Sequence, residues 1–130
     1  MILLDTDVCI ELLRGNALVL EKRATCDDSV AISFMTLAEL FYGVERSNNR
    51  EKNTRLVEEF ILSLTILQSD RLIMQKFGEL KAMFYQRQIM LPDADIFIAA
   101  TALTKCSKLI AGNEKHFSRF DGLLLENWIR

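Results

Sequence analysis

Three acidic residues lie at points of the chain where a hydrophobic core does not require a charge. Asp5 follows the apolar run 2–4, Glu39 lies early in an amphipathic segment, and Asp95 opens a nearly continuous apolar one. Carboxylates gathered within a few ångströms oppose one another's ionisation, and Mg²⁺ or Mn²⁺ with oxygen ligands resolves that repulsion. A metal held in this way activates water and screens a phosphodiester. The three acids therefore predict a carboxylate metal site suited to phosphodiester hydrolysis.

Each acid also has a purely structural interpretation. Thr36 to Glu39 matches the capping-box pattern, in which Glu39 would bond back to the start of its own helix. Asp93 is a good helix N-cap, and Asp95 gains from the helix dipole without binding any ligand. Asp5 could cap a helix that follows the first apolar run. Spacing alone leaves both interpretations open.

The elements that must bring the acids together are short apolar runs alternating with helical segments. Strands are expected near 2–4, 30–32, 64–67, 109–111 and 123–125, and helices over 6–14, 18–24, from Thr36 onward, 50–64, 70–88 and 94–104. This alternation predicts an α/β fold with a central, mostly parallel sheet of four to five short strands flanked by helices. Ligands of such sheets bind beyond the carboxyl ends of the strands, where Asp5 lies.

Composition limits the class of protein further. The 130 residues, 50% of them hydrophobic, with five Gly and one Pro, predict a single domain over 1–130. The formal charge of −2 includes the three candidate acids; without them fifteen acidic residues face sixteen Lys and Arg, so the balance does not exclude a nucleic-acid partner.

The cysteines, the histidine and the apolar stretches exclude several other classes of site. Three widely spaced cysteines without a C-x-x-C pair argue against a disulfide framework or a thiolate zinc site, and His116 is the one histidine. The longest nearly apolar stretch, 96–103, is far below the roughly 20 residues of a membrane span. The first apolar run is short and has no basic residues before it, so it is not expected to act as a signal peptide. A cytoplasmic protein with no membrane association is expected.

Four motifs resemble, in order and spacing, those of PIN-domain ribonucleases, and most of all those of VapC-type toxins from toxin–antitoxin pairs. They are Leu4-Asp5-Thr6-Asp7, Thr36-Leu37-Ala38-Glu39-Leu40, Asp95 leading into Ile98-Ala99-Ala100, and Gly112-Asn113 with His116-Phe117. The resemblance covers essentially the whole chain and implies a PIN-like fold.

The resemblance also implies an activity and partners. These are a Mg²⁺- or Mn²⁺-dependent endoribonuclease acting on structured RNA of the tRNA or rRNA class, a homodimer, and a cognate antitoxin whose C-terminal segment occupies the active-site groove. Carried over residue by residue, the catalytic and metal-binding acids are Asp5, Glu39 and Asp95, with Thr6 and Asp93 in support.

Two positions depart from the family pattern. Asp7 stands where the family often has Asn, and Asn113 stands where many members have a fourth acid. Asn113 could orient a water or a phosphate but adds no charge. Whether one metal or two would bind is therefore left open.

Candidate RNA contacts lie around the expected site. Tyr42 and Arg46 share a helix face with Glu39. There the cation could bind the RNA backbone and the aromatic ring could stack on a base. Arg14 and Lys115 are weaker candidates. His116 could act as a general base or be only structural.

Two other functions compete with a metal-dependent nuclease. Asp5-Thr6-Asp7 after an apolar strand is also typical of haloacid-dehalogenase-like phosphatases, with Asp5 as nucleophile and Asp7 as acid/base. A non-catalytic α/β interaction module would use the same acids only as helix caps, and divalent metal would not change its melting temperature.

Overall fold

A computed structural model describes all residues, 1–130, and has a parallel five-stranded sheet at its centre. The strand order is β3-β2-β1-β4-β5, formed by β1 (Ile2–Leu4), β2 (Val30–Ser33), β3 (Thr65–Leu67), β4 (Lys108–Ile110) and β5 (Leu125–Glu126). In the centre of the sheet, Leu3 pairs with Ala31 on one side and Leu109 on the other. The sheet confirms the predicted α/β class, with five strands that are all parallel.

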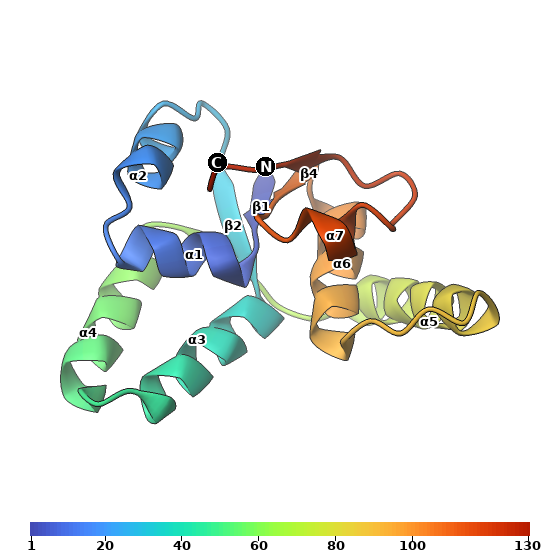
Figure 1. The fold of residues 1–130 in the computed structure, drawn as a ribbon, viewed down its shortest axis with the longest axis horizontal. Helices are drawn as coiled ribbons and strands as arrows, with labels where there is room; N and C mark the ends of the chain where they lie inside the picture. The colour runs from blue at the N-terminus through green and yellow to red at the C-terminus, as the bar shows by residue number, and fades with distance from the viewer.

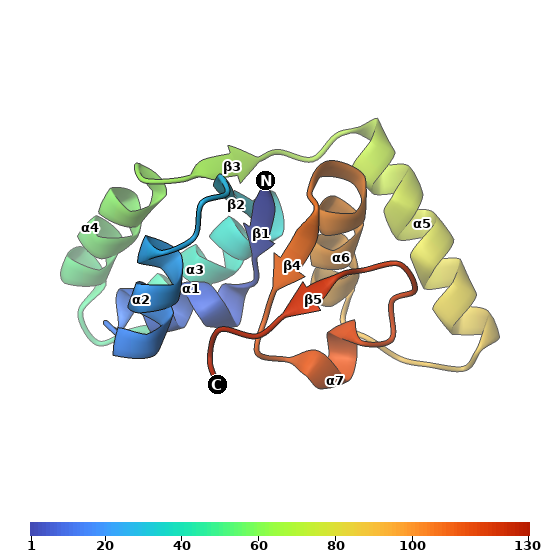
Figure 2. The ribbon, with the colours of Figure 1, turned by 90° about the horizontal axis from the view of Figure 1, so that it is seen from above.

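Helices cover both faces of this sheet (Figure 1 and Figure 2). They are α1 (Thr6–Leu13), α2 (Ala17–Ala24), α3 (Phe34–Arg46), α4 (Arg50–Ile61), α5 (Arg71–Gln86), α6 (Asp93–Lys105) and α7 (Glu114–Phe117). None of them combines the length and apolar character that crossing a membrane requires.

Two hydrophobic clusters, one on each face, hold the layers together. Because side chains alternate along a strand, Ile2 and Leu4 pack with residues of α1 to α4, whereas Leu3 packs with residues of α5, α6 and α7. Burial on both faces explains why the central strand β1 is an unbroken apolar run, whereas the edge strands β3 and β5 are less buried and include Thr65 and Glu126.

The topology brings the ends of several elements to one edge of the sheet. Parallel strands end at a common edge, so α1 after β1, α3 after β2 and α7 after β4 all begin there. Helix α6 precedes β4 and runs back along it, which places its first turn at the same edge. The starts of α1, α3, α6 and α7 therefore surround one region.

Several boundaries differ from the sequence-based expectation; α4, for example, ends at Ile61 rather than at residue 64. Helix α3 begins at Phe34 rather than Thr36, because the Ser33 side chain accepts a hydrogen bond from the Thr36 N–H over 3.1 Å and caps the helix. Strand β5 lies at Leu125–Glu126, later than the expected 123–125. Helix α7 was not expected, since one turn is too short to show a helical period.

Candidate active site

Asp5 occupies the N-cap position of α1 yet does not cap it. Its backbone N–H donates to the Ile110 carbonyl over 2.8 Å, which continues the ladder to β4, while its side chain makes no capping bond. The residue is only 6% exposed. Burial, together with the nearby charges of Asp7 and Asp95, raises the pKa of the Asp5 carboxyl to about 9. A buried acid among other acids is not explained by helix capping.

Glu39 is held by the first residue of α1. The Thr6 hydroxyl donates to Glu39 Oε1 over 2.6 Å, and the Thr6 and Thr36 hydroxyl oxygens lie 3.1 Å apart. Because a hydroxyl has one proton, Thr36 must donate to Thr6 while Thr6 donates to the carboxylate. The capping-box interpretation of Glu39 is wrong, since Ser33 is the cap and Glu39 turns toward α1.

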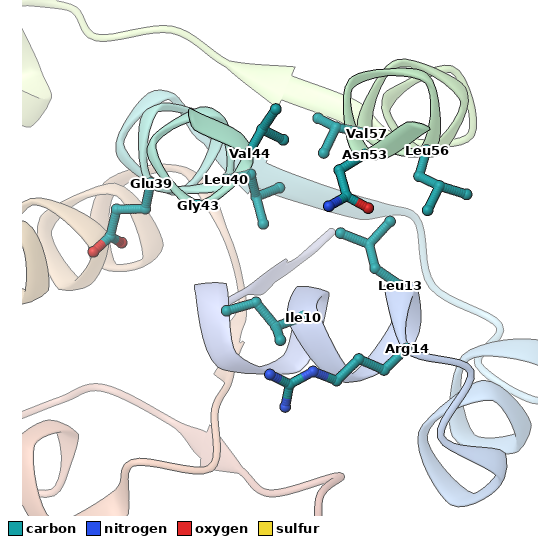
Figure 3. Close-up of a pocket in the computed structure, with 10 residues that line it drawn as sticks. All are labelled: Ile10, Leu13, Arg14, Glu39, Leu40, Gly43, Val44, Asn53, Leu56 and Val57. Atoms are coloured by element: carbon teal, nitrogen blue, oxygen red, sulfur yellow. The ribbon is translucent and has the colours of Figure 1, made fainter. Parts of the chain in front are cut away.

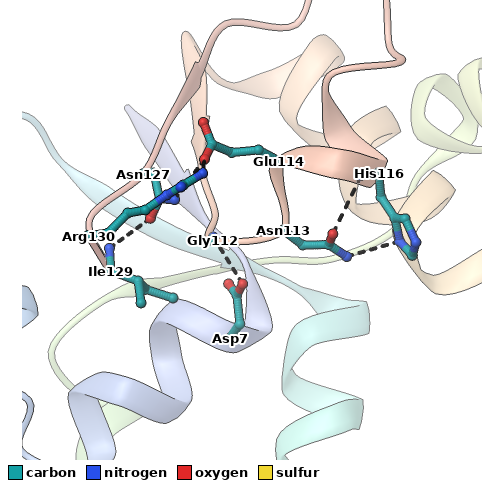
Figure 4. Close-up of polar contacts among 8 residues, drawn as sticks. All are labelled: Asp7, Gly112, Asn113, Glu114, His116, Asn127, Ile129 and Arg130. Atoms are coloured by element: carbon teal, nitrogen blue, oxygen red, sulfur yellow. Dashed lines mark hydrogen bonds and ion pairs between the residues drawn. The ribbon is translucent and has the colours of Figure 1, made fainter.

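Asp7 joins α1 to the turn after β4. The Gly112 N–H donates to Asp7 Oδ2 over 2.9 Å (Figure 4). The other oxygen, Oδ1, is buried without a hydrogen-bond partner and is the one buried side-chain polar atom of the chain in that condition. A buried carboxylate oxygen without a partner is costly in free energy and marks a place where a cation or a proton is needed.

Asp95 and Asp93 have different environments although both lie in the first turn of α6. His116 Nδ1 lies 2.6 Å from Asp95 Oδ2, and the Asn113 amide nitrogen lies 2.9 Å from the same ring nitrogen. Asp93 instead pairs with Lys81 over 2.8 Å at the surface. The expected Asp93 cap is wrong, because Pro92 occupies the N-cap position and no side chain caps α6.

The donor chemistry of this edge fits a hard divalent cation. Asp5, Glu39 and Asp95 supply carboxylate oxygens from three elements, and both the burial of Asp5 and the unpartnered oxygen of Asp7 show a deficit of positive charge. As the side chains stand, no three Asp, Glu, His or Cys side chains form a closed ligand set, since Thr6 holds Glu39 and His116 holds Asp95. The site thus has the donors and the charge for a metal without a preformed shell.

Of the candidate RNA contacts, Tyr42 and Arg46 lie together on α3. The Arg46 guanidinium carbon is 5.6 Å from the centre of the Tyr42 ring, and Tyr42 is 62% exposed. The Lys115 side chain is exposed on α7. Arg14 is the C-cap residue of α1, and its guanidinium lies 3.6 Å from the Glu11 carboxylate.

A groove between α1, α3 and α4 lies next to Glu39 (Figure 3). Its volume is about 310 Å³, and its apolar walls are Ile10, Leu13, Leu40, Val44, Leu56 and Val57. Arg14 and Glu39 add opposite charges to its lining. The sequence did not predict this groove, because it depends on how three helices are placed relative to one another. The structure shows that Ile10 and Leu56 are partly exposed there, which their apolar character alone would not indicate.

The fold and this edge together define a class of protein: a parallel α/β protein with buried carboxylates at the carboxyl ends of its strands. The PIN domain family model matches residues 2–123, and the chain belongs to the PIN domain family, as its motifs predicted.

Its relatives cover nearly its whole length. It is 32% identical to Ribonuclease VapC2 of Rickettsia felis, over 97% of this chain and 96% of the relative. It is 28% identical to the tRNA(fMet)-specific endonuclease VapC of Shigella flexneri, over 97% and 96% of the two chains. Among solved structures, VapBC2 from Rickettsia felis bound to a promoter DNA fragment matches with a TM-score of 0.93 and 30% identity, covering 98% of this chain and 99% of that one.

Proposed function

We propose that this protein is a Mg²⁺- or Mn²⁺-dependent endoribonuclease toxin of a toxin–antitoxin system. The observation that carries the proposal is the Asp5 carboxyl, buried at the end of the central strand and close enough to Asp7 and Asp95 to feel their charges. A protein keeps such a costly arrangement where it serves a function. The names of its relatives, ribonuclease and endonuclease, support the class of reaction.

The residues take distinct roles in this proposal. Asp5, Glu39 and Asp95 would hold the cation, and the Thr6 hydroxyl orients Glu39. When bound, the metal supplies Lewis-acid chemistry, lowering the pKa of water and neutralising phosphate charge. Asn113 caps α7 with its side-chain oxygen and adds no negative charge, so the site has fewer acids than one with a fourth carboxylate there.

The proposed substrate is structured RNA, with tRNA tested first and rRNA second. The Shigella flexneri relative is named for tRNA(fMet), which makes that RNA the first to test. Tyr42 and Arg46, stacked on the exposed side of α3, offer a surface for a base and a phosphate. Lys115 and Arg14 would add positive charge on either side, and Asp93 remains an accessory acid in the proposal.

The proposed partner is an antitoxin that covers the groove between α1, α3 and α4. The groove is apolar along its walls and reaches Glu39, so an amphipathic segment lying in it would also block the acidic site. The similar Rickettsia felis structure contains a VapBC complex. A homodimer belongs to the same proposal, and sedimentation of the free protein tests it.

Cleavage of a tRNA(fMet) transcript tests the activity. Purified protein should cut it with Mg²⁺ or Mn²⁺ and not with EDTA, and Asp5→Ala, Glu39→Ala or Asp95→Asn should each abolish cutting in folded protein. Asp121→Asn is the matched control, because the Asp121 side chain is 82% exposed and its ion-pair partner is Arg87, at 3.6 Å, rather than a residue of the proposed site. Activity that survives all three changes would overturn the proposal. A melting temperature that does not respond to either metal would favour a non-catalytic binding module.

A further inference from the structure

One hydrogen bond reaches the Asp95 carboxylate from outside α6. His116 Nδ1 lies 2.6 Å from Asp95 Oδ2, and no other side chain bonds Asp95. The Asp95 side chain is 18% exposed and the imidazole 34%. The contact therefore lies partly out of water, where a charge-assisted hydrogen bond is strong.

The neighbours of His116 decide which ring nitrogen carries the proton. Nδ1 also lies 2.9 Å from the Asn113 amide nitrogen, and it cannot accept from that amide while donating to Asp95. An ionised carboxylate only accepts hydrogen bonds, so a bare Nδ1 facing it would be repelled. The Asp95 charge thus selects the form of His116 with a proton on Nδ1.

The turn before α7 sets the position of the imidazole. The Gly112 N–H is anchored to Asp7 in α1, and Asn113 caps α7 by accepting from the His116 N–H over 3.4 Å (Figure 4). A line of hydrogen bonds therefore runs from α1 through the turn to His116 and ends on the carboxylate in α6. Both sides of the proposed metal site are linked through this turn.

We propose that His116 is a positioning residue that holds one oxygen of Asp95 so that the other is free to bind the divalent cation. The inference rests on the proposed function, because Asp95 is a ligand only there. Asp95 Oδ1 accepts no hydrogen bond from the chain, whereas Oδ2 is held by the imidazole. Without His116, the carboxylate would sample several rotamers, and metal binding would have to select one of them.

A purely structural role of the contact between His116 and Asp95 predicts a different result. If the contact only joined α7 to α6, its loss would lower thermal stability and leave metal affinity unchanged. Outer partners of metal ligands, in contrast, change affinity by about 10–100-fold when removed. Metal affinity measured without RNA separates the two roles.

The test is the affinity of the RNA-free protein for Mn²⁺, measured by calorimetry and by electron paramagnetic resonance. His116→Leu keeps the bulk and removes the donor, and should weaken binding by about 10–100-fold. His116→Asn places an amide N–H as many bonds from Cα as Nδ1, and should bind within about threefold of the parent, well inside that range. Ser118→Ala, on the exposed end of α7, is the matched control and should bind normally.

Each result has a defined meaning. Normal Mn²⁺ affinity in folded His116→Leu overturns the positioning role while leaving the proposed nuclease intact. No binding by the parent protein overturns the proposed metal site and this inference with it. Weak binding by His116→Leu, restored in His116→Asn, supports positioning.

A second measurement decides the matter if His116→Leu does not fold. Because His116 is the one histidine, its imidazole nitrogens give a single set of nitrogen resonances in a nuclear magnetic resonance spectrum. In the RNA-free parent they should show a proton on Nδ1 and should shift when Mg²⁺ binds. An Nδ1 without a proton, or resonances that do not change when Mg²⁺ binds, would overturn the inference.

Discussion

The carboxylate of Asp7 and the backbone N–H of Gly112, 105 residues apart in the sequence, are joined by a hydrogen bond of 2.9 Å. This bond ties the first turn of α1 to the turn after β4. Since Asn113 and His116 follow directly, it also sets the distance between the acids at the end of β1 and the helix that faces Asp95. A contact between the two ends of the chain thus organises the candidate site.

Gly112→Ala should destabilise the protein, because a Cβ atom there would lie 2.8 Å from Asp7 Oδ2 and 2.6 Å from Ile129 Cδ1. The Ile129 methyl group can rotate away, but Asp7 can move only by giving up its bond to Gly112. We expect a loss of about 1–3 kcal/mol in the free energy of unfolding, measured by chemical denaturation. Gly78→Ala is the control: it lies exposed within α5 with open space around it, and should gain about 0.5–1 kcal/mol. Equal effects of the two changes would contradict this account.

Much of the fold could be predicted from the sequence, because the patterns that predict strands and helices are local in the chain. The apolar runs before Asp5 and after Ser29 predicted two central strands, and the apolar spacing of the longer helices predicted α3, α4 and α5. Helix α6 was predicted from the nearly continuous apolar run after Asp95. The starts of helices were less accurate. The Ser33 side chain caps α3 by accepting a hydrogen bond from the Thr36 N–H. The capping-box pattern from Thr36 to Glu39 predicted a later start of the helix, and the sequence alone does not show which of the two residues, Ser33 or Thr36, is the cap.

Asp5→Asn should separate stability from activity. Asn keeps the shape of the side chain and removes a buried acid that must either keep its charge or take up a proton in the folded state, so in EDTA the variant should be more stable than the parent by about 0.5–2 kcal/mol. It should also lose RNA cleavage and the rise in melting temperature that Mg²⁺ gives the parent. Thermal melting with and without Mg²⁺, beside a cleavage assay, checks all three results. A lower melting temperature in EDTA would show that Asp5 has a structural partner, and Asp121→Asn should change nothing.

The candidate site shows where sequence reasoning ends. The prediction that Asp5, Glu39 and Asp95 meet at one edge rests on strand direction, which the alternating pattern implies. The partners of those acids, Thr6 and His116, depend on side-chain directions set by tertiary packing. For the same reason the sequence did not show that Asp93 turns outward to Lys81 while Asp95, two positions later, faces α7.

Arg46→Gln should weaken RNA binding in a salt-dependent way. The guanidinium lies over the exposed Tyr42 ring on the helix that carries Glu39, so we expect it to contact one phosphate. Loss of one such contact lowers the slope of log affinity against log salt by about 1. Filter binding of a tRNA(fMet) transcript to the inactive Asp95→Asn background, over a series of salt concentrations, measures this slope. Arg55→Gln, exposed on α4, is the charge-matched control, and an identical slope for the two would remove Arg46 from the RNA surface.

Asp70 provides a pH-dependent prediction away from the site. Its side chain caps α5 by accepting from the Ile73 N–H over 3.0 Å and pairs with Lys105, at the end of α6, over 2.5 Å. The Lys105 ammonium and the helix N–H groups hold the pKa of the Asp70 carboxyl below its ordinary value of 3.8. A carboxyl whose pKa is lower in the folded state stabilises the fold above the unfolded value, and this contribution is lost as the pH falls through the folded value.

Asp70→Asn should therefore melt below the parent at neutral pH, and the difference should vanish in acid below both pKa values. Asn retains the capping oxygen, so Asp70→Ala should melt lower still at every pH, because it loses the cap as well as the charge. Because the Asp70–Lys105 pair is partly exposed, added salt should reduce the difference in melting temperature between the parent and Asp70→Asn. The difference between Asp70→Asn and Asp70→Ala should not change with salt. Thermal melting across pH at two salt concentrations measures both gaps. A difference between the parent and Asp70→Asn that persists in acid would mean that Asp70 stabilises the helix junction by packing rather than by charge.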